Sequence, residues 1–111
     1  MNFITRLLIS TVAVIVSAYV LPGVGVNSFL TAVLVAIILS VLDVLVKPIL
    51  VILTIPFTIM TLGLFLLVIN AIIILLASSL IDGFTVDGFW YALLFSIVMS
   101  LINSILGGSS K

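Results

Sequence analysis

The chain contains no cysteine and no histidine, and only 5% of its 111 residues are charged. Without these two residue types there is no disulfide, thiolate nucleophile or imidazole base, and the usual zinc ligands are missing. A net charge of zero provides no electrostatic footprint for nucleic acid. No Gly-rich phosphate loop or serine-nucleophile motif is present. We therefore expect neither an enzyme nor a nucleic-acid-binding protein, and no metal or cofactor.

Hydrophobic residues are what the chain has in excess. They make up 66% of it, whereas soluble domains are about 45–50% apolar and about 25% charged. So few charged side chains could not cover the surface of a soluble fold. The composition predicts a single all-α domain, residues 1–111, that is integral to a lipid bilayer.

Four apolar runs are long enough to be membrane helices. A helix needs about 20 residues to cross the hydrocarbon core. The interval from Ile49 to Ile81 carries no charge and is too long for one straight span, but two spans and a turn do not fit in it. The sequence therefore predicts four transmembrane helices, at residues 3–21, 28–46, 62–81 and 89–106.

The segment between the second and third spans, about 48–61, is interrupted by proline. Pro48 suits the first turn of a helix, where its missing N–H has no partner to lose. Pro56 disfavours a helical residue before it and should bend or stop a short helix. We expect either a re-entrant or an interfacial segment here. The alternative is a long, tilted, kinked third helix that begins near Ile49.

The few charges orient the chain. In the four-span arrangement Arg6, Lys47 and Lys111 fall on one side, and Asp82 and Asp87 fall on the other. The positive-inside rule then places both termini and Lys47 in the cytoplasm. A different interpretation takes the N-terminal stretch, which ends in a small-residue site at residues 16–18, as a cleavable secretory signal.

The two halves of the chain align at an offset of 60 residues. Gly23–Asp43 lies over Gly83–Asn103, with identities that include Gly23/Gly83, Phe29/Phe89, Ala32/Ala92 and Ser40/Ser100. Both halves predict a helix, a short outer loop and a helix, so the repeat is parallel. It comprises residues 3–46 and 62–106, joined by a linker at 47–61. Asn27 and Asp87 lie at the predicted N-cap position of the second helix of each half.

Small and polar residues recur along the second helix of each half, in a helical spacing. Such residues either let helix backbones pack closely or line a path for a polar solute. Asp43 and Lys47 are spaced for an ion pair at the inner surface, and Asp43 could instead bind a proton or cation. The candidate functional or packing residues are Ser40, Asp43, Lys47, Pro48, Pro56, Gly63, Asn70, Ser100 and Asn103.

The centre of the chain, from Asp43 to Ala71, has the pattern D-x-x-x-K-P-I-L-x-x-L-T-x-P-x-x-x-x-T-L-G-L-F-x-x-x-x-N-A. This pattern resembles the four-transmembrane phage holin family (superfamily IV, mycobacterial-phage type) of bacterial membrane proteins. That family more often has Asn and Arg at the positions of Asp43 and Lys47. The resemblance implies a small protein that oligomerises in the bacterial cytoplasmic membrane and permeabilises it.

Three functions are compatible with the sequence. The first is a holin-like protein that self-associates through its small-residue faces and permeabilises the bilayer. The second is a non-conducting envelope protein that scaffolds or regulates a membrane-protein partner. The third is a small ion channel or transporter, in which Asp43 is the one acid within a span. A homo-oligomer is expected in each case, because one chain of four helices leaves little room for an aqueous pore.

Overall fold

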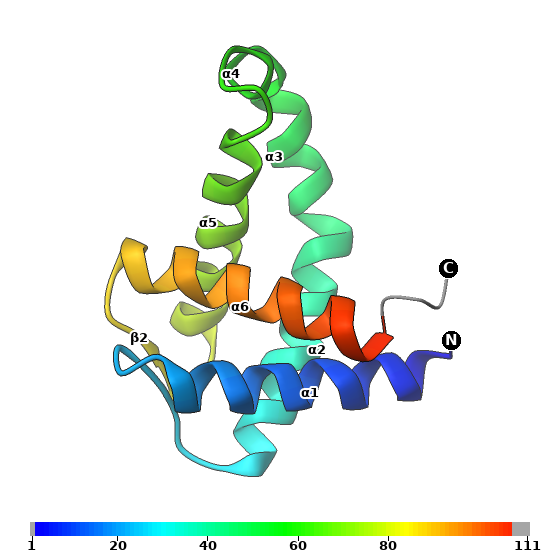
Figure 1. The fold of residues 1–111 in the computed structure, drawn as a ribbon, viewed down its shortest axis with the longest axis vertical. Coiled ribbons are helices and arrows are strands. Elements are labelled where there is room, and N and C mark those ends of the chain that lie inside the picture. Colours follow the sequence, from blue (N-terminus) through cyan, green and yellow to red (C-terminus); the bar gives the residue numbers. More distant parts are fainter. Residues whose placement is uncertain (1, 108–111) are drawn as a thin grey trace.

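The computed structural model describes residues 2–107, and within them the chain is almost entirely helical (Figure 1). Lys111, which the sequence places with the cytoplasmic charges, lies outside the described residues. The elements in chain order are α1 (Phe3–Val20), β1 (Val24–Val26), α2 (Phe29–Leu45), α3 (Lys47–Leu53), α4 (Ile55–Met60), α5 (Phe65–Leu80), β2 (Phe84–Val86) and α6 (Phe89–Gly107).

The four long helices coincide with the four predicted spans. Helices α1 and α6, with 18 and 19 residues, are long and apolar enough to cross a membrane. Helix α2 qualifies as a third span together with α3, across a bend of 41°. Helix α5 is apolar but has only 16 residues, about 24 Å at 1.5 Å per residue. By length and composition, two or three helices of the described chain can cross a membrane.

The proline-interrupted segment forms two short helices at the end of α2. Pro48 stands in the first turn of α3, as predicted. Pro56, which the sequence predicts to bend or stop a helix, instead stands in the first turn of α4, and Ile55 before it is helical. Thr54 separates them, and its hydroxyl donates to the carbonyl oxygen of Leu50 over 2.7 Å. A turn then reverses the chain before α5, with Gly63 at a φ of +91°, a conformation that glycine adopts without steric cost. The alternative of one kinked helix from Ile49 into α5 is therefore wrong.

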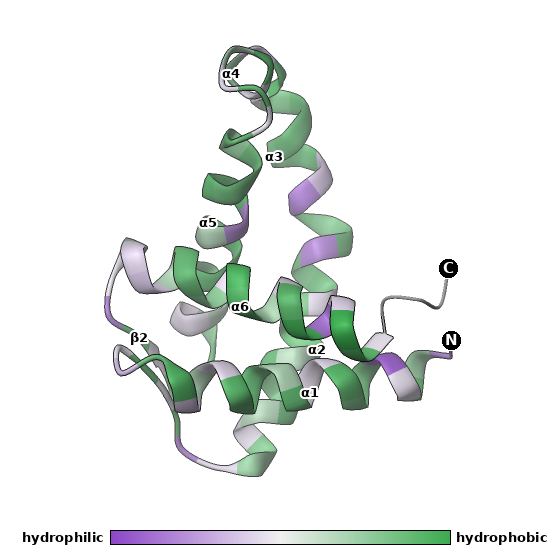
Figure 2. Cartoon of the chain, viewed as in Figure 1, coloured by the Kyte–Doolittle hydropathy of each residue, from purple (hydrophilic) through white to green (hydrophobic). Residues whose placement is uncertain are grey.

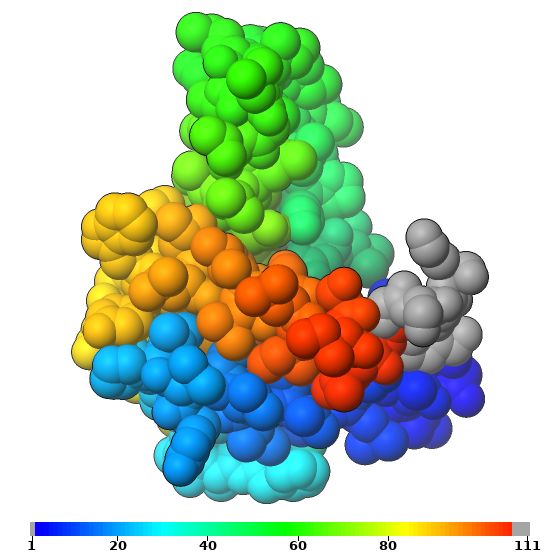
Figure 3. Space-filling view, in the orientation of Figure 1, coloured from blue at the N-terminus to red at the C-terminus, as the bar shows by residue number. Residues whose placement is uncertain are grey.

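The long helices form two crossing pairs. Helix α1 packs against α2 and α6, and α5 packs against the same two helices. Figure 1 shows α1 and α6 side by side across the view, whereas α2, α3 and α5 run up it. The space-filling view shows that the green segment, which includes α4, projects well beyond α1 and α6 (Figure 3). The two pairs thus meet near one end of the molecule and separate toward the other.

Two short strands, which the sequence does not predict, join the loop after α1 to the loop after α5. β1 and β2 pair in antiparallel register, with Gly25 opposite Thr85. At one end of the ladder the N–H of Asn27 donates to the carbonyl oxygen of Gly83 over 2.9 Å; at the other, Asp87 donates to Gly23 over 2.7 Å. Both donors and both acceptors are 60 positions apart. The contacts between the loops therefore follow the same offset as the sequence.

Because of this ladder, the N-cap of α2 lies one residue later than the sequence predicts. The cap of α2 is Ser28, whose Oγ accepts the N–H of Thr31 over 3.1 Å. The prediction of Asn27 is wrong because its backbone belongs to the ladder. The Asn27 side chain instead accepts a hydrogen bond from the Thr31 hydroxyl over 2.6 Å. Asp87 likewise lies two positions before its helix, α6.

The core lies between the ladder and the helix crossing. Small residues on all four long helices, among them Ala13, Ala32, Ala77 and Ala92, have no exposed surface. Small side chains allow backbones to approach where no hydrophobic effect drives helices together. Near the ladder, the predicted small-residue seams therefore pack inside one chain. Phe84 and Phe95 close this core, with ring centroids 5.5 Å apart.

The strand register can be tested because the chain has no cysteine of its own. Val24 and Val86 are directly opposite each other, and such pairs have Cβ atoms within about 5.5 Å, close to disulfide geometry. We expect the Val24→Cys/Val86→Cys double variant to form an intramolecular disulfide on mild oxidation, measured by mass and by loss of maleimide labelling. Val24→Cys/Thr85→Cys is the control, because adjacent strand residues face opposite sides. Equal oxidation of both variants would contradict the register.

Candidate functional site

A polar cavity of about 140 Å³ lies where the helix pairs separate. Figure 2 shows that the hydrophilic positions of α5, α6 and the junction of α2 with α3 gather around this region. Helices α1, α2, α3, α5 and α6 all contribute to its wall. The candidate residues that it brings together are Ser40, Asp43, Lys47, Asn70, Ser100 and Asn103. Pro48, Pro56 and Gly63 are absent from its lining and instead shape α3, α4 and the turn after α4.

The wall is built from corresponding positions of the two halves of the chain. Each pair of lining residues is separated by 60 positions: Ser10/Asn70, Ala36/Ser96, Leu39/Met99, Ser40/Ser100 and Asp43/Asn103. The correspondence of Ser10 with Asn70 is the signal in the sequence that could have placed Ser10 at the same site. Ten of the 13 lining residues form these five pairs, whereas Lys47, Ile73 and Ile74 have no counterpart in the lining.

The polar side chains in the cavity have few protein partners. Ser40 and Ser96 donate to carbonyl oxygens of their own helices, at 2.9 and 2.8 Å. Within the described residues, Asp43, Asn70 and Asn103 make no side-chain hydrogen bond to the protein. Asp43 is exposed, and Asn70 and Asn103 are half-buried, so all three side chains are open to water or to a polar ligand.

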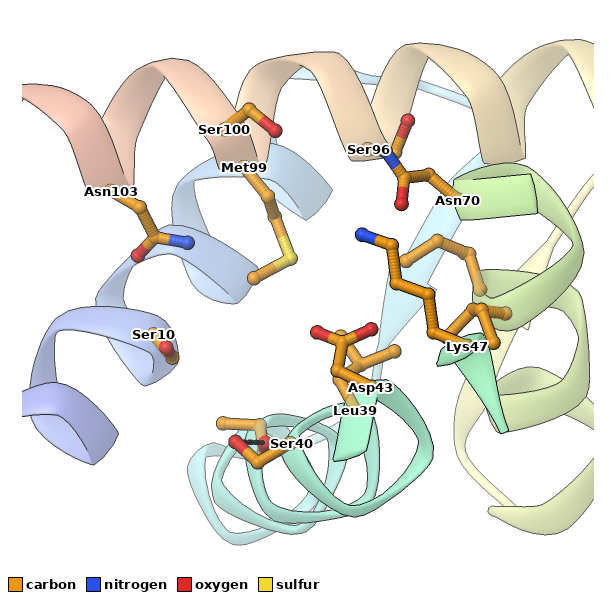
Figure 4. Close-up of a pocket in the computed structure, with 13 residues that line it drawn as sticks. Ser10, Leu39, Ser40, Asp43, Lys47, Asn70, Ser96, Met99, Ser100 and Asn103 are labelled. Atoms are coloured by element: carbon orange, nitrogen blue, oxygen red, sulfur yellow. Dashed lines mark hydrogen bonds between the residues drawn. The ribbon is translucent and has the colours of Figure 1, made fainter. Parts of the chain in front are cut away.

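Asp43 and Lys47 both point into the cavity (Figure 4). The sequence predicts an ion pair between them at the inner surface, but no bond joins them among the residues drawn. Asp43 belongs to α2 and Lys47 begins α3, so the two residues lie on either side of a 41° bend. Lys47 extends toward Asn70 instead (Figure 4). The cavity thus carries one acid and one base, both available to a ligand.

Toward the ladder the cavity is closed by apolar side chains. Ala36 and Ser96 line this end and are buried, as are the apolar lining residues Leu39, Ile73, Ile74 and Met99. One turn nearer the ladder on α6, Phe95 has no exposed surface. The cavity is therefore a pocket entered from one end, without a continuous opening through the described chain.

A second, wider cavity adjoins the first on the side of the helix termini. It has a volume of about 400 Å³ and shares Ser10, Ser40, Asp43 and Asn103 with the polar cavity. Its other lining residues are Phe3, Arg6, Leu7, Ile9, Val44 and Gly107. The wider cavity brings the second cation of the described chain, Arg6, to the mouth of the polar one.

Comparison with known proteins places the chain among bacterial membrane proteins. Residues 1–105 match the family described as mycobacterial 4 TMS phage holin, superfamily IV. The uncharacterized membrane protein YvlD of Bacillus subtilis is 38% identical over 101 residues, covering 90% of this chain and 85% of YvlD. The uncharacterized protein SCO3922 of Streptomyces coelicolor is 35% identical, covering 92% of this chain and 90% of that protein. No solved structure matches the chain.

Proposed function

The chain belongs to the mycobacterial 4 TMS phage holin family of superfamily IV, and on this basis we propose that it permeabilises the bacterial cytoplasmic membrane to small polar solutes or ions. The route begins in the polar cavity of each chain. The holin-like activity proposed is thus a restricted permeability, in which the polar residues of the cavity hold water inside the bilayer.

The proposed topology has four spans in two parallel repeats, with α2 as the second span and α3 continuing it from Lys47 at the cytoplasmic surface. The ladder of β1 and β2 lies at the outer surface with Asp82 and Asp87, and both termini and Lys47 lie on the cytoplasmic side. Two observations support it: the distribution of charge along the chain and the contacts that recur at an offset of 60 residues. In this topology the cavity opens toward the cytoplasm.

The observation that carries the proposal is the pairing of cavity residues across the two halves. Transporters built from repeats place their solute sites at the boundary between the repeats, and here that boundary is where the polar residues meet. A volume of about 140 Å³ holds several water molecules, since one needs roughly 10–15 Å³ by the same measure. It is far too small for a protein, so the proposed solutes are ions and small polar molecules.

Proteoliposomes test this function directly. We expect vesicles that contain the purified protein to lose protons and potassium faster than protein-free vesicles. The same vesicles should retain the larger dye calcein. Ser100→Leu should reduce the ion flux because it places an apolar side chain in the cavity. Ser104→Leu is the matched control, since Ser104 lies one turn further on α6, is exposed, and does not line either cavity.

The dependence on protein density separates the alternatives. A route within each chain predicts flux in proportion to density, whereas a hole formed by self-association predicts a steep rise and loss of calcein. Homo-oligomerisation remains a prediction, and cross-linking in the same vesicles would measure it. Vesicles that stay tight to protons and potassium at every density would contradict permeabilisation and favour the scaffolding function.

A further inference from the structure

The geometry points to a binding site for the head group of a membrane phospholipid in the two connected cavities. The phosphodiester lies at the junction of the cavities, with Arg6 on the side of the wider one and Lys47 on the side of the polar one. The rest of the head group contacts Asp43 and Asn103, which line both. This inference goes beyond solute passage and does not depend on it.

Charge is the first argument. Arg6 and Lys47 are the two basic residues of the described chain, and both line this connected space. Asp43 is the one acid within the same lining, so the site has an excess of one positive formal charge. A phosphodiester carries one negative charge and accepts charge-assisted hydrogen bonds from guanidinium and ammonium groups. A single phosphodiester therefore brings the site to neutrality.

The second argument is the mixed character of the wider cavity. Beside Arg6, its wall includes Phe3, Leu7 and Val44. Phe3 and Val44 are 62% and 71% exposed, so this side of the cavity is open to its surroundings. In the proposed topology those surroundings are the lipids of the cytoplasmic leaflet. A free phosphate would leave the apolar wall unused, whereas a phospholipid places its glycerol and the start of its acyl chains along it.

Polar side chains without protein partners in the described part of the chain line the connected cavities. Asn70, Asn103 and the Asp43 carboxylate make no side-chain hydrogen bond to the protein within the described residues. They can accept from an ethanolamine ammonium or from glycerol hydroxyls, which the head groups of phosphatidylethanolamine and phosphatidylglycerol supply. The choline of phosphatidylcholine has no N–H or O–H to donate. We therefore expect both donor-bearing lipids to bind more tightly than phosphatidylcholine.

Native mass spectrometry of the full chain in mild detergent tests the site. Phosphatidylglycerol, phosphatidylethanolamine, phosphatidylcholine and free glycerol phosphate are titrated separately. We expect one molecule of either donor-bearing phospholipid per chain and no comparable binding of glycerol phosphate. Arg6→Gln/Lys47→Gln should weaken binding by about tenfold or more, because two charged hydrogen-bond donors are lost. Arg6→Lys/Lys47→Arg, which keeps both charges, should restore it.

The outcomes are independent of any flux measurement, because binding is read as mass. Equal affinity of the wild type and the Arg6→Gln/Lys47→Gln variant would overturn the site, as would a glycerol phosphate affinity equal to that of the lipids. If that variant fails to fold, Asp43→Asn provides a second test. This variant should weaken the binding of phosphatidylethanolamine more than that of phosphatidylglycerol, because the Asp43 carboxylate accepts from the ethanolamine ammonium. An unchanged preference between these two lipids would contradict the placement of the head group.

Discussion

Ser100→Cys should react with a charged, membrane-impermeant methanethiosulfonate at least about tenfold faster than Leu101→Cys, because only a thiol that reaches water forms the reactive thiolate. Ser100 lines the polar cavity, whereas its neighbour Leu101 is 58% exposed and lines neither cavity. In a bilayer, exposed apolar positions of this kind face lipid. The two variants thus differ in surroundings but share a helix and a depth.

The measurement is simple because each variant contains a single thiol. Sealed vesicles of known orientation are labelled from each side, and the modification is counted by mass. In the proposed topology Ser100→Cys reacts from the cytoplasmic side. Ser40→Cys, at the corresponding position of the first repeat, should react from that side as well.

Equal reaction of Ser100→Cys and Leu101→Cys would mean that the cavity does not hold water in the membrane. Faster reaction from the outer side would reverse the orientation and contradict the cytoplasmic termini. Each result is read against labelling in denaturant, which gives the reactivity of the same thiol without the fold.

The long helices were predictable because the bilayer itself sets their length and composition. The sequence places spans at 3–21 and 89–106, and the helices run from Phe3 to Val20 and from Phe89 to Gly107. Proline chemistry predicted a break next to Pro56, and α3 and α4 are separated nearby, at Thr54. These features depend on local sequence, so a single chain reveals them.

The cavity was predictable only in part. Helical spacing placed Ser40 and Asp43 on one face of α2, but not whether that face packs or borders a cavity. That outcome depends on how the helix pairs separate, which is a tertiary property. The strands β1 and β2 were missed for a similar reason: each has three residues, and their pairing joins distant parts of the chain. Asp43 and Lys47 have the spacing of an ion pair on a straight helix, but they lie on either side of the bend between α2 and α3.

Phe95→Ser should raise the flux of protons and potassium by an order of magnitude or so, because apolar constrictions block ions by excluding water. Phe95 has no exposed surface and packs against Phe84, with ring centroids 5.5 Å apart. It lies one turn from the cavity residue Met99, on the side of the ladder. A hydroxyl here adds a polar group next to the buried Ser96, which already lines the cavity.

Phe95→Leu is the matched control, because it removes the ring but keeps the position apolar. It should leave the flux near the wild-type level. Loss of a buried phenylalanine side chain costs about 3–5 kcal/mol of stability when it is truncated to alanine, so each variant is first checked by circular dichroism and thermal unfolding. Val35→Ser, at the corresponding position of the first repeat, removes less volume and is expected to act in the same direction.

Comparing Phe95→Ser with Phe95→Leu distinguishes two ways in which the ion route could be closed at this end of the cavity. If Phe95→Ser and Phe95→Leu raise the flux equally, loss of packing and not wetting opens the route. If Phe95→Ser folds but its vesicles leak no more protons and potassium than wild-type ones, the apolar end of the cavity is not the barrier to ions. The polar cavity is then a binding site without a passage. A rise in Phe95→Ser alone would show that one apolar layer separates the water of the cavity from the outer surface. Opening would then require only a small movement of α6 relative to β2.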